Sequence, residues 1–342
     1  MKKFNLILMI IMFIATGLSF AQSSRNGTEG ATELLIPVGA RGVAMGNADL
    51  TNSHGVDALF WNPANLVRTN NNVDVLVSHM NYIADIGVQY GAIGVGLGNF
   101  GSMAFSIKSL GIGDILKTTI RNPDGTGQTF SPQYTTIGLS YAKMLSDRVS
   151  VGANFQYVSE TIDLVSASGL SMDFGVTYSN LAGIEGFSMA IVLKHIGPDL
   201  QFDGSGLWVK ATNPNQRRGE QFYKINSAPF SLPTVFNIGL GYDFVLNNEN
   251  NITFAGSFEN HNNYSDQYRV GMEYNYDNLL FFRSGYLYTT DVDKDDTLYD
   301  FSVGFGLNYE VSGVGFMLDY AYLPTNVFNN DTHLISVSLG IK

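Results

Sequence analysis

Hydrophobic and polar positions alternate along most of this chain. From Phe236 to Phe244 every second residue is aromatic or aliphatic, and the residues between them are Asn, Gly or Asp. The same period of two recurs over 252–259, 268–276 and 301–309. Such a period places one set of side chains on each face of a β-strand. Because no long apolar helix pattern follows the N-terminus, the alternation predicts an all-β fold, a transmembrane β-barrel with one face toward lipid.

The alternating segments predict fourteen antiparallel strands. They are expected at 73–80, 87–96, 101–110, 135–145, 148–160, 168–179, 186–197, 232–246, 251–261, 266–276, 279–288, 299–309, 314–323 and 333–342. Bacterial single-chain barrels have an even number of strands, so both ends of the barrel domain, 73–342, are expected on the periplasmic side. Closure leaves no unpaired strand edge in lipid, where a backbone group finds no water.

The connections between these strands separate into a long and a short set. If the first connection faces outward, the outer loops are 81–86, 111–134, 161–167, 198–231, 262–265, 289–298 and 324–332, which include every long loop. The inner turns are short and rich in Asn, Asp or Gly, as outer-membrane barrels require on the periplasmic side. A soluble β-sandwich also alternates, but it has no reason to sort its loops, so we prefer the barrel.

Composition agrees with a lipid-facing wall. Charged residues make up 14% of the chain and aromatic residues 13%, whereas soluble domains carry about 25% charged residues. Tyrosines near strand ends are expected to form an interfacial girdle, although cross-strand packing also explains some of them; they are Tyr157, Tyr276, Tyr288, Tyr309 and Tyr322. The chain has no cysteine, which excludes disulfides, thiolate catalysis and zinc–thiolate sites.

Residues 1–21 have the features of a signal peptide. Lys2 and Lys3 precede an apolar run over 6–14, and Ser-Phe-Ala at 19–21 supplies a small-x-small cleavage site. The mature chain is therefore expected to begin at Gln22. Loss of the two lysines changes the formal net charge from -11 to -13. We expect no nucleic-acid partner for so acidic a chain.

Residues 22–72 do not alternate, and they are predicted to form a segment that plugs the lumen. A barrel of this strand number has a lumen wide enough for water unless something fills it. Small residues at six positions over 39–48 would let the segment pack closely inside the wall. The expected plug or wall contacts are Arg41, Gly42, Gly46, Asp57, Trp61, Asn62 and Pro63. A charge inside a barrel needs a partner or water, so we expect Arg41 to pair with Glu259 or Glu273.

Two motifs in this segment resemble those of a known family. Gly39-Ala-Arg-Gly-Val-Ala-Met-Gly-Asn-Ala48 and Asp57-Ala-Leu-Phe-Trp-Asn-Pro-Ala-Asn-Leu66 are similar to the N-terminal signature of the PorV/PorQ outer-membrane proteins, which in turn resemble FadL-type fatty-acid transporters. The resemblance implies a fourteen-stranded barrel with an N-terminal segment in the lumen. The chain departs from the family pattern at Asn47 and Asn65, where glycine is usual, and its last residue is not aromatic. These departures leave the subfamily open.

No catalytic or metal site emerges from the remaining motifs. Gly96–Gly101 has dinucleotide-binding spacing but continues as a strand, so we expect a strand turn. The acidic loop 291–296 lacks the turn glycine and the final acid of a calcium loop, which favours a solvated loop over an ion site. The five histidines show no paired ligand spacing, and no nucleophile motif marks a Ser-His-Asp set. We expect no enzymatic activity, cofactor or bound metal.

The longest outer loop carries the candidate partner contacts. They are Leu207, Trp208, Arg217, Arg218 and Phe222. Aromatic side chains beside arginines are typical of interface hot spots, but a loop folded over the barrel mouth with its aromatics buried fits the sequence equally well.

The family resemblance implies a role in type IX secretion. A barrel in the bacterial outer membrane would then bind secreted cargo or the translocon through its outer loops, without catalysis. One alternative is a FadL-type transporter of fatty acids or other hydrophobic small molecules, and another is a purely structural barrel. The mainly polar inward positions weaken the transporter alternative, because passage of an apolar ligand needs a continuous apolar pocket.

Overall fold

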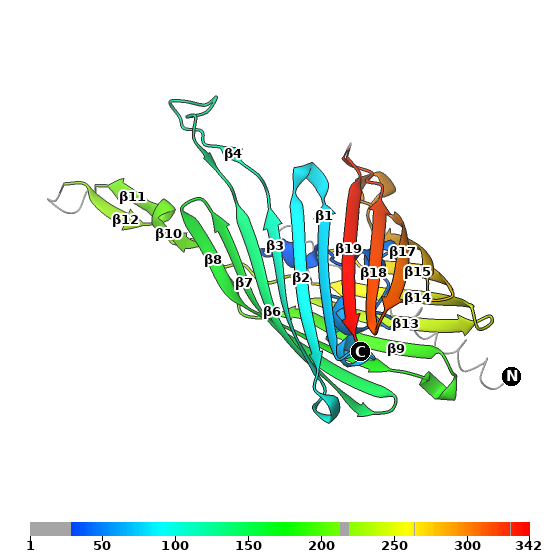
Figure 1. Ribbon diagram of the computed structural model, residues 1–342. Coiled ribbons are helices and arrows are strands. Elements are labelled where there is room, and N and C mark those ends of the chain that lie inside the picture. Colours follow the sequence, from blue (N-terminus) through cyan, green and yellow to red (C-terminus); the bar gives the residue numbers. More distant parts are fainter. Residues whose placement is uncertain (1–28, 213–218, 263, 329) are drawn as a thin grey trace.

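Fourteen strands of the computed structural model, which describes residues 29–212, 219–262, 264–328 and 330–342, form one closed antiparallel barrel (Figure 1). They are β1 (Val73–Asn81), β2 (Gly87–Gly96), β3 (Ser102–Gly111), β6 (Gln133–Ser146), β7 (Val149–Ile162), β8 (Val165–Tyr178), β9 (Phe187–Ile196), β13 (Val235–Val245), β14 (Asn250–His261), β15 (Gln267–Tyr276), β16 (Leu280–Thr289), β17 (Phe301–Val311), β18 (Val314–Leu323) and β19 (Thr332–Ile341). Consecutive barrel strands pair, and β1 pairs with β19 to close the sheet. The predicted fourteen-stranded barrel is confirmed.

The other elements are short. Ribbons β4 (Ile115–Leu116) with β5 (Thr129–Phe130) and β11 (Trp208–Ala211) with β12 (Gln221–Lys224) lie in the two longest loops, and β10 (Asp203–Gly204) pairs with β8. The helices are α2 (Ala40–Ala44), η1 (Thr32–Leu35), η2 (Gly55–Ala58), η3 (Pro63–Val67), η4 (Ile83–Asp85), η5 (Gly98–Phe100), η6 (Leu181–Gly183), η7 (Ser205–Leu207) and η8 (Lys294–Asp296). Among the described residues, no helix is both long and apolar enough to span a membrane.

The two faces of the wall differ as the alternation predicts. Phe105, Phe254 and Phe305 are exposed on the outer face, whereas Ser140 and Asn237 are buried on the inner face. Gly96 ends β2, and residues 97–101 form the turn that leads to β3, as expected. An apolar outer face over a polar inner face is typical of a membrane-spanning barrel with a polar interior.

Long loops gather at one end of the barrel, which we call the outer end, and the turns at the inner end are short. The longest inner turn, 179–186, has eight residues, whereas the loop between β9 and β13 spans 197–234. Both ribbons project from the outer end (Figure 1). The predicted outer loop at 161–167 is wrong: β7 and β8 continue to a two-residue turn at Asp163 and Leu164, where Asp163 has a φ of 49°. Polar outward residues, Thr161 and Ser166, gave this part of β7 and β8 the composition of a loop.

Residues 29–72 run through the lumen instead of along the wall (Figure 1). Helix α2 packs against β16, β17, β18 and β19, and η3 packs against β6, β7 and β8 on the other side. The segment therefore reaches across the barrel from one wall to the opposite one, and most of its side chains are buried.

Candidate functional site

Glycines in the wall lie beneath the segment that crosses the lumen. A Cβ at Gly285 would come within 2.0 Å of the Gly46 backbone nitrogen, and one at Gly271 within 2.4 Å of the Met45 carbonyl oxygen. On the opposite wall, a Cβ at Gly175 would come within 2.0 Å of Asn62 Oδ1. The segment and the wall approach so closely there that no side chain larger than glycine fits between them.

An ionic network ties the segment to the wall. Arg41 donates from Nε and Nη2 to the Glu273 carboxylate at 3.1 and 3.2 Å, and from Nη1 to the Asn52 carbonyl oxygen at 2.9 Å. Arg283 donates to Glu273 at 2.5 Å and to Asp319 at 2.6 Å. The expected partnership of Arg41 with Glu273 is therefore observed. The other candidate acid, Glu259, binds Arg269 of the wall.

The Asn-Pro pair begins the second contact with the wall. Asn62 Oδ1 accepts from the Ala64 backbone N–H at 3.0 Å and so caps η3, and Pro63 occupies its first turn. Asn62 Nδ2 donates to Thr177 Oγ1 of β8 at 2.8 Å, and Thr177 in turn donates to Asn65 Oδ1 at 2.7 Å. Asn65, which departs from the family pattern, thus extends the hydrogen bonding between η3 and β8.

An aromatic pair between these two contacts meets two buried lysines. Trp61 packs on Gly42, where a Cβ would come within 2.4 Å of its ring, and stands edge-on to Phe60 with ring centroids 4.9 Å apart. The ammonium groups of Lys194 and Lys108 lie 4.6 and 5.2 Å from the centre of the Phe60 ring. Sequence reasoning missed this cation–aromatic cluster. The sequence did contain one signal for it, because both lysines occupy inward-facing positions in the alternation of their strands.

Asp57 lies near the inner end of the lumen. It borders a cavity of about 230 Å³ together with Asn71 and Asp74, and its Oδ2 accepts from Ser338 Oγ at 3.5 Å. Burial, with the Asp319 charge second, raises the pKa of Asp57 to about 7. This carboxyl group can therefore change its charge near neutral pH.

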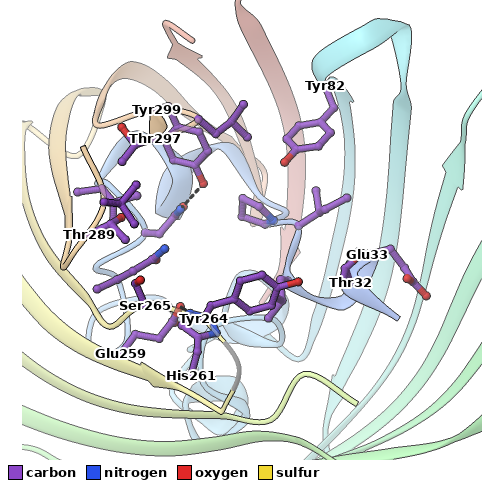
Figure 2. A pocket seen from close by; sticks show the side chains of 18 of the residues that line it. Thr32, Glu33, Tyr82, Glu259, His261, Tyr264, Ser265, Thr289, Thr297 and Tyr299 are labelled. Carbon is purple, nitrogen blue, oxygen red and sulfur yellow. Dashed lines mark hydrogen bonds and ion pairs between the residues drawn. The ribbon is translucent and has the colours of Figure 1, made fainter. Parts of the chain in front are cut away.

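A second cavity, of about 600 Å³, opens inside the outer end (Figure 2). Tyr82, Tyr264 and Tyr299 surround it (Figure 2), and Tyr299 accepts a hydrogen bond from Asn47 at 3.0 Å. One part of its lining is apolar, from Leu35, Ile36, Pro37, Ile86, Leu110 and Ile112, and another is polar, from Glu259, His261, Gln267, Arg269, Thr289 and Thr297. No pattern in the sequence indicated this cavity, because its lining comes from segments far apart in the chain.

The tip of the longest outer loop exposes aromatic side chains. Trp208 and Phe222 are 51% and 63% exposed, and the pairing of β11 with β12 places both on one face with Lys210 and Lys224. Leu207 ends η7 immediately before this ribbon. Arg217 and Arg218 lie outside the described residues. The base of the same loop is buried, since Leu200 and Leu232 are 1% and 3% exposed. The exposed ribbon remains a candidate for partner contacts.

The acidic loop 291–296 is exposed. Within it, Lys294 forms an ion pair with Asp300 at 2.9 Å. Among the described residues, no group of three or more His, Asp or Glu side chains is arranged to hold a metal ion.

Comparisons with known proteins give a family and a fold. The family model described as type IX secretion system protein PorV matches residues 19–261. The toluene transporter TbuX of Ralstonia pickettii is 14% identical, with 89% of this chain and 98% of that chain covered and a TM-score of 0.51. The toluene transporter TodX of Pseudomonas putida is 12% identical, with 93% and 98% covered and a TM-score of 0.52. No curated protein matches the chain. At these identities the solved structures share the fold alone.

Proposed function

The chain belongs to the PorV family of type IX secretion system proteins, and on that premise we propose that its outer loops bind secreted cargo or the secretion translocon. Fold and family both point to the bacterial outer membrane as its location. On this proposal the barrel catalyses no reaction, and the segment 39–66 keeps the lumen closed while the outer end makes protein contacts.

One contrast carries the proposal. The middle of the lumen is occupied by a segment seated on wall glycines, whereas the outer end presents a ribbon with exposed Trp208 and Phe222. Exposed aromatic side chains beside cations are the residues that protein interfaces use as anchors. A barrel with an occupied lumen and exposed aromatic side chains at its outer end suits contact with a partner better than passage of a solute.

The second ribbon enlarges this outer surface. Ile115, Leu116 and Ile120 are exposed on or beside β4, and Lys117 binds Asp163 at the tip of β7 and β8 at 2.6 Å. The β11–β12 loop reaches the same tip, because β10 pairs with Val165 and Ser166. Both loops therefore contact the tip of β7 and β8, where a folded partner could contact the two ribbons together.

The test is a pull-down from detergent-solubilised membranes, with recovered proteins identified by mass spectrometry. We expect the wild-type chain to recover translocon components or cargo C-terminal domains. The double change Trp208→Ala and Phe222→Ala should lower that recovery at least tenfold, because each truncation of an interface anchor typically costs about 2 kcal/mol or more.

The matched control is Phe100→Ala. Phe100 is an aromatic residue in the turn between β2 and β3, at the inner end, and is 77% exposed, more than either ribbon aromatic. Recovery should stay at the wild-type level with this variant, and all variants should keep heat-modifiable gel mobility. Unchanged recovery with the ribbon variant, or an equal loss with the control, would remove the ribbon from the proposal.

A second candidate function is transport of hydrophobic small molecules. The observation that favours it is the outer cavity of about 600 Å³ with an apolar part to its lining, in a fold shared with two toluene transporters. Transport requires a path past the segment 39–66. Saturable uptake of a long-chain fatty acid or toluene by proteoliposomes, with no protein partner in the pull-down, would support this candidate over the first.

A further inference from the structure

Residues 30–36, which we call the arm, lie in a slot at the outer end. The slot holds the arm mainly through its backbone. Lys108 Nζ donates to the carbonyl oxygens of Glu33 and Ile36 at 2.6 and 2.5 Å. The Ala31 N–H donates to Glu160 Oε1 at 2.8 Å, and the Gly30 N–H donates to the Ser231 carbonyl oxygen at 3.2 Å.

Two arm side chains fill an apolar pocket of the slot. Ala31 and Leu34 are buried in one cluster with side chains from β7, β8 and the base of the longest loop. The slot residues of this cluster are Val158, Ala167, Leu200, Leu232, Phe202 and Phe230. Leu200 and Phe230 also bond to each other through their backbones at 2.8 and 2.9 Å. The loop that carries the β11–β12 ribbon thus forms one side of the slot.

We propose that the slot is a peptide-binding site that the arm fills at rest as a single helical turn, Thr32–Leu35, and that a segment of a secreted partner with the same turn displaces the arm. The peptide would carry a small residue followed three positions later by leucine, as Ala31 and Leu34 do. The inference rests on the proposed function only for the source of the peptide.

The contacts explain why another peptide could replace the arm. Every peptide offers the carbonyl and N–H groups that Lys108 and Glu160 bind, so these contacts depend on the turn of the backbone rather than on one sequence. The outer cavity runs alongside Thr32 and Glu33 (Figure 2). It gives a partner access to the slot without movement of the segment 39–66.

One residue makes the arm a weak occupant of its own slot. The Glu33 side chain is 4% exposed. Burial first, and the Glu160 charge second, raise its pKa to about 8 against the attraction of Lys108. Docking of the arm therefore places an acid where its charge is disfavoured. A peptide with a neutral residue at this position should bind more tightly than the arm.

The absence of cysteine allows a single-cysteine test on the full chain in detergent. Ala31→Cys places a thiol in the slot, and its maleimide labelling rate reports release of the arm. The probe is a synthetic peptide of residues 29–38 carrying Glu33→Gln. We expect this peptide to raise the labelling rate at least tenfold with saturation, and the same peptide with Leu34→Asp to have no effect. Ile120→Cys, at a fully exposed position, should label at one rate throughout.

Lys108→Met separates the slot from general loosening. It removes both hydrogen bonds that Lys108 donates to the arm, so the Ala31→Cys thiol should label faster without peptide and should no longer respond to it. No response to the peptide in folded protein, either from Ala31→Cys or from a second reporter, Leu34→Cys, overturns the inference. Because the probe is the chain's own sequence, this result is independent of the pull-down. Failure of the pull-down with intact peptide binding removes only the secretion role.

Discussion

Arg41→Met should release the segment from the wall without unfolding the barrel. The change keeps most of the side-chain volume and removes the guanidinium that joins α2 to Glu273, a residue of β15. Arg41 lies outside the barrel strands, so the change leaves the hydrogen bonds between the strands intact. The expected effect is local opening of residues 39–48.

The structure sets the size of this effect. Breaking a buried ion pair by removing one partner costs about 3–5 kcal/mol. Glu273 keeps Arg283 at 2.5 Å, which lowers the cost, but Asp49, fully buried and 3.9 Å from Arg41, loses its nearest cation. We therefore take the lower end, about 3 kcal/mol, which is roughly a hundredfold in the opening equilibrium.

Amide hydrogen exchange measured by mass spectrometry reads that equilibrium directly. The Val43 and Met45 N–H groups are bonded within α2, to Gly39 and Arg41 carbonyl oxygens. Their exchange should accelerate roughly a hundredfold in Arg41→Met, as the free energy above requires. Adding Asp49→Asn should restore part of the protection, because it removes the uncompensated carboxylate.

Arg269→Met is the matched control. Arg269 also makes a short two-point contact with a buried glutamate, Glu259, but both residues belong to the wall. Its loss should leave exchange over 39–48 at the wild-type rate. If Arg41→Met leaves those rates unchanged in folded protein, or Arg269→Met raises them equally, the ion pair does not hold the segment.

Two further changes test the seating and the charge of the segment. Gly175→Ala places a Cβ 2.0 Å from Asn62 Oδ1, so protease cleavage of residues 55–67 should rise. The control Gly111→Ala, whose Cβ would have no atom within 4 Å, should be cleaved like the wild type. Equal cleavage of the two variants would contradict close packing of the segment on the wall. The raised pKa of Asp57, about 7, means that the folded chain keeps a proton the unfolded chain loses near its ordinary value of 3.8. Stability therefore falls as pH rises from about 4 to 7. Asp57→Asn should flatten that fall in thermal melts between pH 5 and 8, and an unchanged profile would refute it.

The barrel was predictable because its signals are local. The period of two is set by each strand's own faces, and loop lengths are visible in the chain. The prediction was wrong over 161–167, because β7 and β8 extend beyond the apolar belt, where the outward positions 161 and 166 carry Thr and Ser and the segment resembles a loop in composition. The turn at Asp163 depends on a positive φ that several residue types tolerate.

The lumen was predictable only in part. A charge such as Arg41 demands a partner, which restricted the choice to inward acids, but only the path of the segment selects Glu273 over Glu259. The same path decides which wall glycines contact the segment. The sequence alone therefore could not distinguish Gly175 and Gly285 from other strand glycines. The slot joins residues more than a hundred positions apart, as Ala31 and Glu160 show.

The two parts of the N-terminal segment are held by different forces, and this difference separates the candidate functions. Residues 39–66 are seated against wall glycines and tied by buried ions, so moving them breaks contacts worth several kcal/mol. The arm depends on backbone hydrogen bonds and on the burial of two apolar side chains, Ala31 and Leu34, and it carries the disfavoured Glu33. Solute passage must displace the first part, whereas peptide exchange needs only the second. Exchange that is fast over 30–36 and slow over 39–66 in wild-type protein therefore favours binding at the outer end, and fast exchange over both parts favours transport.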